Sequence, residues 1–169
     1  TRYSRQISLP EIGEGGQEKL HKARVLIVGA GGLGSPAALY LAGAGVGTIG
    51  LADDDTVGIS NLQRQILYTE NEAGQLKVHC AAQRLRALNG NIEVHAHPFR
   101  LNRENARRLI ADYDIVVDGC DNFSTRYLIS DSCSALHKPY VYGAIQGFEG
   151  QVSVFLSLIH ISEPTRRVV

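Results

Sequence analysis

Eleven residues decide the fold of this chain: Arg24-Val-Leu-Ile-Val-Gly-Ala-Gly-Gly-Leu-Gly34. The apolar run predicts a buried strand, and Gly29, Gly31 and Gly34 fit the G-x-G-x-x-G spacing of a tight turn into a helix. Glycine in such a turn brings backbone N–H groups close to phosphate, at the positive end of the following helix. Asp53 ends the next predicted strand about twenty residues later, where a carboxylate can accept hydrogen bonds from ribose hydroxyls. The pattern predicts a nucleotide site and leaves the nucleotide open.

Strand-like and helix-like segments alternate along the rest of the chain. This alternation is typical of an α/β protein, and we predict a Rossmann-like, doubly wound, mostly parallel sheet with helices on both faces. The predicted strands are Val25–Gly29, Thr48–Ala52, Glu93–His97, Ile115–Asp118, Tyr140–Ala144 and Gln151–Phe155. The predicted helices are Gly16–Lys22, Leu33–Gly45, Ala73–Leu88, Arg103–Asp112 and Ser124–Leu136.

Two cations downstream of the glycine loop favour a triphosphate over a dinucleotide. We expect Ser60 and Asn61 to cap a helix, which would place Arg64 and Gln65 within about one turn of the cap. A guanidinium there can straddle phosphate oxygens while charge develops on leaving pyrophosphate. Lys77, near the start of the next predicted helix, can supply a second positive charge. A nicotinamide cofactor, which must receive hydride, needs neither cation, so the pattern favours ATP.

Two carboxylates, Asp118 and Asp121, follow the apolar run 115–117. The carboxyl end of a strand in such a sheet faces the ligand crevice, and Mg²⁺ prefers one or two carboxylates together with phosphate oxygens. Asp121, followed by Asn122, is the residue that we expect to hold Mg²⁺. For Asp118 the sequence leaves two roles open, one at the metal and one in capping the next helix or accepting hydrogen bonds from loop amides.

The composition excludes several classes of protein. Lys and Arg together number 17, as do Asp and Glu, so no net charge draws the chain to nucleic acid or membrane. No apolar stretch reaches the roughly 18 residues of a membrane span, and the polar N-terminus lacks a signal-peptide core. The three cysteines are scattered, which argues against a disulfide framework or a metal site. We therefore expect a cytoplasmic protein with no nucleic-acid or membrane partner.

Six motifs in this order resemble the ThiF/MoeB/HesA family, bacterial relatives of ubiquitin-activating enzymes. They are Arg2-Tyr-Ser-Arg-Gln6, Gly29-Ala-Gly-Gly-Leu-Gly34, Ala52-Asp-Asp-Asp55, Ser60-Asn-Leu-Gln-Arg-Gln65, Asp118-Gly-Cys-Asp-Asn122 and Gly147-Phe-Glu-Gly-Gln151. Any one of them could arise by chance, whereas all six in order are highly specific. The resemblance covers Arg2 through Phe155.

The resemblance implies an adenylyltransferase. The family uses MgATP to adenylate the C-terminal Gly-Gly carboxylate of a small ubiquitin-like sulfur-carrier protein, and it releases pyrophosphate. A carboxylate is already a nucleophile at neutral pH, so no protein base is required. Catalysis would then come from positioning and from charge neutralisation.

The resemblance also implies roles for individual residues. Arg64 and Lys77 would contact the triphosphate, Asp121 would organise Mg²⁺ and Asp53 would hold the ribose. Arg5 would reach into the ATP site of a neighbouring subunit, which implies a homodimer with two composite sites. The other residues expected to contact the nucleotide are Gly29, Gly31, Gly32, Gly34, Asp55, Asn61 and Gln65.

The C-terminal segment departs from the family pattern. Members of the family continue with two CxxC pairs that bind structural Zn²⁺, so we expect that metal only in a missing C-terminal part. Residues 156–169 resemble the translation of a sequencing adapter. We therefore assign 1–155 to an incomplete ATP-binding adenylyltransferase domain and 156–169 to a non-native tail. Such a domain is expected to fold poorly or to bind its carrier weakly.

Several alternatives stay open from the sequence. An NAD(P)-dependent oxidoreductase would use the same glycine loop, and a non-catalytic homologue would bind a nucleotide without reacting. Adenylation of a carboxylate on modified tRNA is a further possibility, against which the neutral charge and the spelling of residues 61–64 argue. The carrier would serve thiamine thiazole or molybdopterin synthesis, and the run 37–47 followed by 52–55 favours thiamine.

Overall fold

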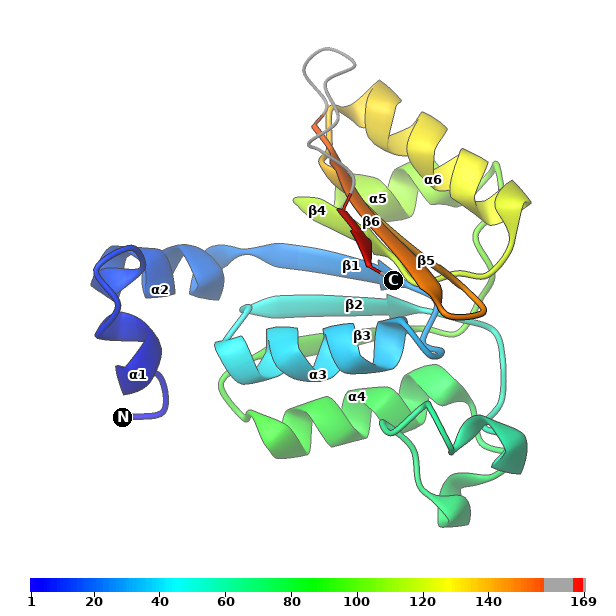
Figure 1. Cartoon of the computed structure of the whole chain (residues 1–169), viewed down its shortest axis with the longest axis horizontal. Helices are drawn as coiled ribbons and strands as arrows, with labels where there is room; N and C mark the ends of the chain where they lie inside the picture. Colours follow the sequence, from blue (N-terminus) through cyan, green and yellow to red (C-terminus); the bar gives the residue numbers. More distant parts are fainter. Residues whose placement is uncertain (157–165, 169) are drawn as a thin grey trace.

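A seven-stranded sheet lies at the centre of the computed structural model, which describes residues 1–156 and 166–168 (Figure 1). Its strands, in spatial order, are β3 (Glu93–His97), β2 (Thr48–Ala52), β1 (Arg24–Val28), β4 (Ile115–Asp118), β5 (Tyr140–Gln146), β6 (Glu149–Phe155) and β7 (Arg166–Val168). Strands β3 to β5 in this order are parallel, and β6 and β7 continue the sheet antiparallel. The chain runs outward from β1 to β3 and returns to β4 on the other side of β1. This order confirms the predicted Rossmann-like, doubly wound fold.

Helices cover both faces of the sheet, as predicted (Figure 1). One face carries α3 (Gly34–Ala44) and α4 (Lys77–Leu88), and the other carries α5 (Ala106–Ala111) and α6 (Phe123–Leu136). Each face has its own apolar core, because successive side chains of a strand point to opposite sides. In β1, Ile27 packs in the core on the side of α3 and α4, whereas Leu26 packs in the core with α5 and α6.

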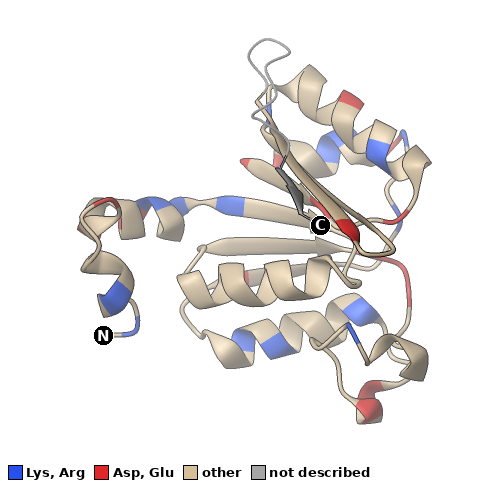
Figure 2. Cartoon of the chain, in the orientation of Figure 1, with Lys and Arg blue, Asp and Glu red and all other residues tan. Residues whose placement is uncertain are grey.

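Helix α3 carries no charged residue, in contrast to α4, α5 and α6 (Figure 2). Ala38 and Ala42 are fully buried, yet Tyr40 on the outer side of the helix is 82% exposed. A helix that is apolar on all sides is usually covered on all sides. The outer side of α3 is therefore an uncovered apolar surface in the single chain.

Two helices precede the sheet, α1 (Ser4–Ile7) and α2 (Gly13–Lys22). The sequence predicted only α2, with a later start at Gly16. The side-chain amides of Gln6 and Gln17 both donate to the carbonyl of Ala44, at the C-terminal end of α3. The glycine loop lies at the other end of α3, so α1 and α2 sit at the opposite end of the sheet from that loop (Figure 1).

Helix α4 begins at Lys77 and not at Ala73, where the sequence placed its start. Residues Glu70–Glu72 instead form a 3-10 turn, η2. Gly74 then adopts a left-handed φ of 84°, and its N–H donates to the carbonyl of Val57 at 2.8 Å. This pairing with a segment earlier in the chain, and not local helix propensity, sets the start of α4.

Helix α5 is also shorter than the predicted Arg103–Asp112. The turn before it is stabilised by Asn102 and Asn105, because each side chain accepts a hydrogen bond from the backbone N–H of the other. Such side-chain bonds compete with the first turn of a helix. None of the helices in residues 1–156 is both long and apolar enough to cross a membrane.

Strand β7 lies within the segment 156–169 that the sequence assigned to a non-native tail. Its backbone pairs with β6, with Gly150 opposite Val168. Residues 157–165 and 169 lie outside the described part of the chain. The division of the chain at residue 155 therefore stays a prediction.

Candidate nucleotide site

A cavity of about 600 Å³ opens at the carboxyl ends of the parallel strands. This is the crevice in which doubly wound proteins bind their ligands. The predicted site residues that line it are Gly29, Gly31, Gly32, Asp53, Asp55, Arg64, Gln65, Lys77 and Asp121. They come from five separate stretches of sequence, so the fold brings together most of the residues expected to form the site.

The glycine loop is packed backbone to backbone. Gly29 has a φ of 89°, which residues with a side chain rarely adopt. A Cβ atom at Gly34 would lie 1.8 Å from the carbonyl oxygen of Gly29, and one at Gly119 would lie 2.8 Å from that oxygen. The β1–α3 turn therefore needs glycine at Gly34 for close packing. Gly34 does not line the cavity, and it packs against the backbone of Gly29 within the loop.

Asp53 and Tyr68 fix the conformation of this loop. The backbone N–H of Ala30 donates to one carboxylate oxygen of Asp53, and the N–H of Asp55 donates to the other, each at 2.8 Å. The hydroxyl of Tyr68 donates to the carbonyl of Ala30 at 2.6 Å. Burial, together with the nearby Asp53, raises the pKa of Tyr68, so the phenol stays a neutral donor. Each carboxylate oxygen of Asp53 has a lone pair left for a ligand hydroxyl.

The turn that carries Arg64 and Gln65 is built on Asn61. The backbone N–H groups of Arg64 and Gln65 both donate to the carbonyl of Asn61, and its side chain accepts from the N–H of Gly58 at 2.9 Å. Asn61 does not line the cavity and acts as a cap. Arg64 is exposed, and its side chain passes beside Gly32 in the glycine loop. Its guanidinium donates to the carbonyl of Ser60 at 3.3 Å, and the residue lines the cavity.

Lys77 is buried at the first position of α4, with a side chain only 6% exposed. Its Nζ lies 3.3 Å from a carboxylate oxygen of Asp55, and its backbone N–H donates to the carbonyl of Asp55 at 3.0 Å. A cation at a helix N-terminus is electrostatically unfavourable, and Asp55 offsets that cost. The ammonium group has further N–H bonds to offer a phosphate.

Asp118 and Asp121 have different environments although they are three positions apart. Asp118 is 2% exposed, and its carboxylate accepts from the N–H of Cys120 at 2.9 Å and from the hydroxyl of Tyr140 at 2.5 Å. Burial and this hydrogen bond raise the pKa of Tyr140. Asp121 is exposed and lines the cavity. Of the two roles left open for Asp118, the structure supports the one of accepting hydrogen bonds within the loop.

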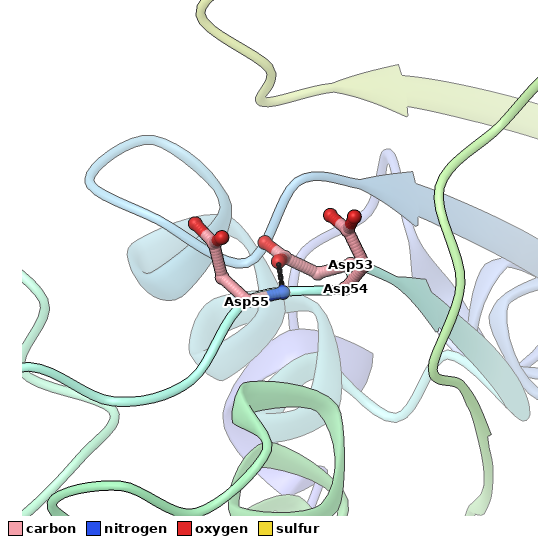
Figure 3. Close-up of side chains that lie close together, drawn as sticks. All are labelled: Asp53, Asp54 and Asp55. Atoms are coloured by element: carbon pink, nitrogen blue, oxygen red, sulfur yellow. Dashed lines mark hydrogen bonds between the residues drawn. The ribbon is translucent and has the colours of Figure 1, made fainter.

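A second group of carboxylates lies across the cavity at the end of β2. Asp53, Asp54 and Asp55 place one oxygen each within 4.8 Å of one another, and their side chains project to the same side of the backbone (Figure 3). Carboxylate oxygens suit Mg²⁺, which binds to one or two of them and to phosphate. The donors on both sides of the cavity, Asp121 and this group, thus fit the metal expected with ATP.

Arg126 in α6 is a cavity residue that the sequence analysis missed. Its guanidinium donates to the carbonyls of Gly143 at 2.8 Å and Cys120 at 2.6 Å, and it lies 3.6 Å from the Asp118 carboxylate. Its carbon Cζ also lies 4.7 Å from the ring centre of Tyr142. Arg126 thus joins α6, the loop that carries Asp121 and strand β5. An arginine in an amphipathic helix gives no sequence signal of this role.

The segment Phe99–Leu101 also lines the cavity and was not predicted. It follows β3, whose end at His97 was predicted correctly. The rule that ligands meet the carboxyl ends of parallel strands could therefore have found it.

Arg5 lies outside the cavity. It is exposed in α1, at the opposite end of the sheet from the glycine loop (Figure 1). The fold therefore does not bring Arg5 to the site of its own chain.

Comparison with known sequences identifies relatives over nearly all of the chain. The sequence model of the ThiF family matches residues 3–167. A sulfur carrier protein adenylyltransferase from Thermus thermophilus is 52% identical over 154 residues, and a probable molybdopterin-synthase adenylyltransferase from Porphyra purpurea is 52% identical over 155. The adenylyltransferase and sulfurtransferase MOCS3 of Anopheles gambiae is 54% identical over 154 residues. These alignments cover 91% to 92% of this chain and 35% to 57% of the relatives.

Solved structures share the same fold. PaaA superimposes with a TM-score of 0.82 at 28% identity, covering 94% of this chain and 51% of that protein. The E. coli protein MccB, solved with ATP, superimposes with a TM-score of 0.81 at 26% identity, covering 92% of this chain and 48% of MccB. MccB has also been solved with AMPCPP and MccA, with a TM-score of 0.82 at 26% identity and the same coverage of both chains.

Proposed function

The chain belongs to the ThiF family, and on this premise we propose that it binds MgATP and adenylates the C-terminal carboxylate of a ubiquitin-like sulfur-carrier protein. The names of its relatives support the reaction, because they describe adenylyltransferases for a sulfur carrier protein and for molybdopterin synthase. The chain spans 41% and 57% of the length of these two relatives.

One observation carries the proposal. Arg64, Gln65, Lys77 and Asp121 line a single cavity together with the glycine loop. The conformation of the loop is set by Asp53 and Tyr68, so its amides at Gly31 and Gly32 need not be rearranged when phosphate binds. Preorganised donors and cations around one cavity are suited to a ligand with several negative charges.

The proposed reaction is an in-line displacement. A carboxylate oxygen of the carrier forms a bond to the α-phosphorus, and the bond from that phosphorus to the bridging oxygen of the β-phosphate breaks. Pyrophosphate leaves with its charge increased, and Arg64 and Lys77 neutralise that charge. The role of the protein is therefore to position two anions against each other and to stabilise the leaving group.

Asp121 is the proposed ligand of Mg²⁺. It is the exposed carboxylate of its loop, while Asp118 is engaged by Cys120 and Tyr140. When bound, the metal would neutralise part of the charge on the phosphate oxygens. Arg126 holds the loop that presents Asp121, through its bond to the carbonyl of Cys120.

A homodimer is the proposed assembly, with Arg5 acting in the site of the neighbouring subunit. Two observations support it. Arg5 is exposed and lies away from its own cavity. The outer side of α3 is an apolar surface around Tyr40, and such surfaces frequently mark contacts between proteins.

Between the two carrier pathways left open by the sequence, the names of the relatives favour molybdopterin synthesis over thiamine synthesis.

Pyrophosphate exchange tests the proposal. The chain, MgATP and a purified carrier ending in Gly-Gly are incubated with labelled pyrophosphate, and the label is followed into ATP. We expect exchange to require the carrier and its terminal glycines. Arg64→Ala should reduce exchange at least about a hundredfold, because a charge on the leaving group is no longer neutralised.

The matched control is Arg107→Ala, which removes an exposed arginine of α5 away from the cavity. This variant should exchange like the wild type. Normal exchange by Arg64→Ala would disprove the role of Arg64. Binding of NADH in preference to ATP would instead support the oxidoreductase alternative, and ATP binding without exchange would support a non-catalytic homologue.

A further inference from the structure

The loop that presents Asp121 is fixed on both sides of that residue. On its C-terminal side, Asn122 caps helix α6, because its side chain accepts from the backbone N–H of Thr125 and from the hydroxyl of Ser124, each at 2.9 Å. Asp121 itself is exposed and lines the cavity. The direction in which its carboxylate points therefore also depends on what holds residues 118–120 on the other side.

That other side is held by Asp118, which uses both of its carboxylate oxygens. Oδ1 accepts from the backbone N–H of Cys120 at 2.9 Å, and this bond to a residue two positions later closes a tight turn. Gly119, at the centre of the turn, donates its N–H to the carbonyl of Val28 at 2.8 Å. Oδ2 accepts from the hydroxyl of Tyr140 at 2.5 Å. The turn is therefore tied to β1 through its backbone and to β5 through the carboxylate.

Tyr140 is a firm anchor for this carboxylate. It is 4% exposed, and its ring stacks on that of Phe155 in β6 with the ring centres 5.7 Å apart. Arg126 also faces Oδ2 of Asp118, but at 3.6 Å, which is beyond the length of a hydrogen bond. A hydrogen bond to an ionised acceptor is stronger than one between neutral groups. The hydroxyl of Tyr140 therefore sets the orientation of the carboxylate.

We propose that Tyr140 is a positioning residue for Mg²⁺ binding, because through Asp118 it fixes the turn 118–120 and hence the direction of Asp121. This role rests on the proposed function, in which Asp121 holds the metal of MgATP. It deepens that function, because Tyr140 lies outside all six motifs that resemble the ThiF family. Groups that orient a metal ligand commonly contribute a factor of about ten or more to metal affinity.

The test is Tyr140→Phe, which removes one oxygen atom and keeps the ring that packs on Phe155. ATP is titrated into the chain by calorimetry, once with Mg²⁺ and once with EDTA. In the variant, the affinity with Mg²⁺ should fall about tenfold and the affinity in EDTA should stay unchanged, because only the metal ligand has lost its orientation. A purely structural role would lower both affinities equally, so an equal fall in both, or no fall in either, would overturn the role of Tyr140.

A second measurement needs neither ATP nor metal. Amide hydrogen exchange in the free chain reports whether the turn 118–120 opens more often. In Tyr140→Phe the N–H of Cys120 should exchange about tenfold faster than in the wild type, whereas the N–H groups of β1 should keep their rates. Unchanged exchange at Cys120 would show that the hydroxyl does not hold the turn, and it would overturn the role.

Tyr113→Phe is the matched control. Tyr113 is buried in the same apolar core as Tyr140, and its hydroxyl lies 2.8 Å from Nε2 of His97 in β3 and not beside the loop of Asp121. Its ATP affinities with Mg²⁺ and with EDTA should keep the wild-type ratio. The same change of ratio in both variants would overturn the specific role of Tyr140.

Failure of this role and failure of the proposed function give different results. Wild-type affinities in Tyr140→Phe would overturn the role of Tyr140 and leave the proposed function intact. A wild-type chain that binds no ATP would overturn the proposed function, and the role of Tyr140 in metal binding with it.

Discussion

Strands β2 and β6 lie on opposite sides of β1 in the strand order, and these two sides of the sheet are built differently. All five residues of β2 are buried, whereas β6 buries only Ser153 of its seven. The β5–β6 hairpin also exposes large apolar side chains, with Ile145 at 66%, Phe148 at 99% and Val152 at 51%. The side with β1, β2, α3 and α4 therefore owes its stability to its own packing. The hairpin side contributes less to the core, although Ile145 reaches the cavity.

The largest expected difference between the two sides comes from adding one methyl group to a glycine. Gly34→Ala places a Cβ against the carbonyl of Gly29, so the turn must open, and we expect a loss of at least about 3 kcal/mol in unfolding free energy. Gly150→Ala in β6 is the matched control, because its Cβ would lie 3.8 Å from the nearest atom. Urea unfolding measures both. A Gly34→Ala chain as stable as the Gly150→Ala chain would contradict the tight packing of the loop.

Truncation of one apolar side chain on each side should give the next largest difference. Leu51 in β2 is fully buried, so Leu51→Ala should cost about 3 kcal/mol through lost burial and the cavity left behind. Val152→Ala in β6 should change stability by less than about 0.5 kcal/mol, because its side chain is half exposed. Similar losses for both variants would show that the hairpin is covered in solution.

Arg126 connects the two sides, and its removal should have an intermediate effect. Arg126→Met leaves the carbonyls of Cys120 and Gly143 without their donor and Asp118 without a cation, and we expect a loss of about 2 kcal/mol. Arg107→Met is the control on an exposed position of α5. If both variants unfold at the same urea concentration, Arg126 does not fasten the hairpin to the site.

The smallest expected effect is a loss of stability that occurs only at alkaline pH. Burial raises the pKa of Cys120 and of Cys133 to about 12, against about 8.5 in an unfolded chain. Above pH 8.5 the unfolded chain loses thiol protons that the folded chain keeps, so stability falls as the pH rises and is unaffected below that value. Each thiol should cost about 1.4 kcal/mol at pH 9.5.

The measurement is urea unfolding at pH 7.5 and pH 9.5, for the wild type and for Cys133→Ala. The variant should lose less stability between the two values than the wild type does. An equal loss in both chains would show that Cys133 is not protected from ionisation by the fold.

The sequence predicted the buried side of the sheet well, because its signals there are local. A strand of apolar residues followed by spaced glycines defines β1 and its turn, and the carboxyl-end rule then places Asp53 and Asp121 at the cavity. Arg64 lines the cavity for a similar reason, since it and Asn61 belong to one turn.

The remaining features could not be predicted from the local sequence, because they depend on contacts between segments that are distant along the chain. Pairing of Gly74 with Val57 delays the start of α4, and this puts Lys77 at the helix end beside Asp55. The role of Arg126 depends on Gly143, seventeen positions away in β5.

The close contact of Gly29, Gly34 and Gly119 has a consequence at the level of the gene. The backbones of these three residues touch, so there is no room for a Cβ at any of them. Every nucleotide change in the first or second position of a glycine codon replaces glycine or ends the chain. These three codons therefore allow only silent third-position changes, and a saturation-mutagenesis library selected for function should retain glycine alone at all three positions.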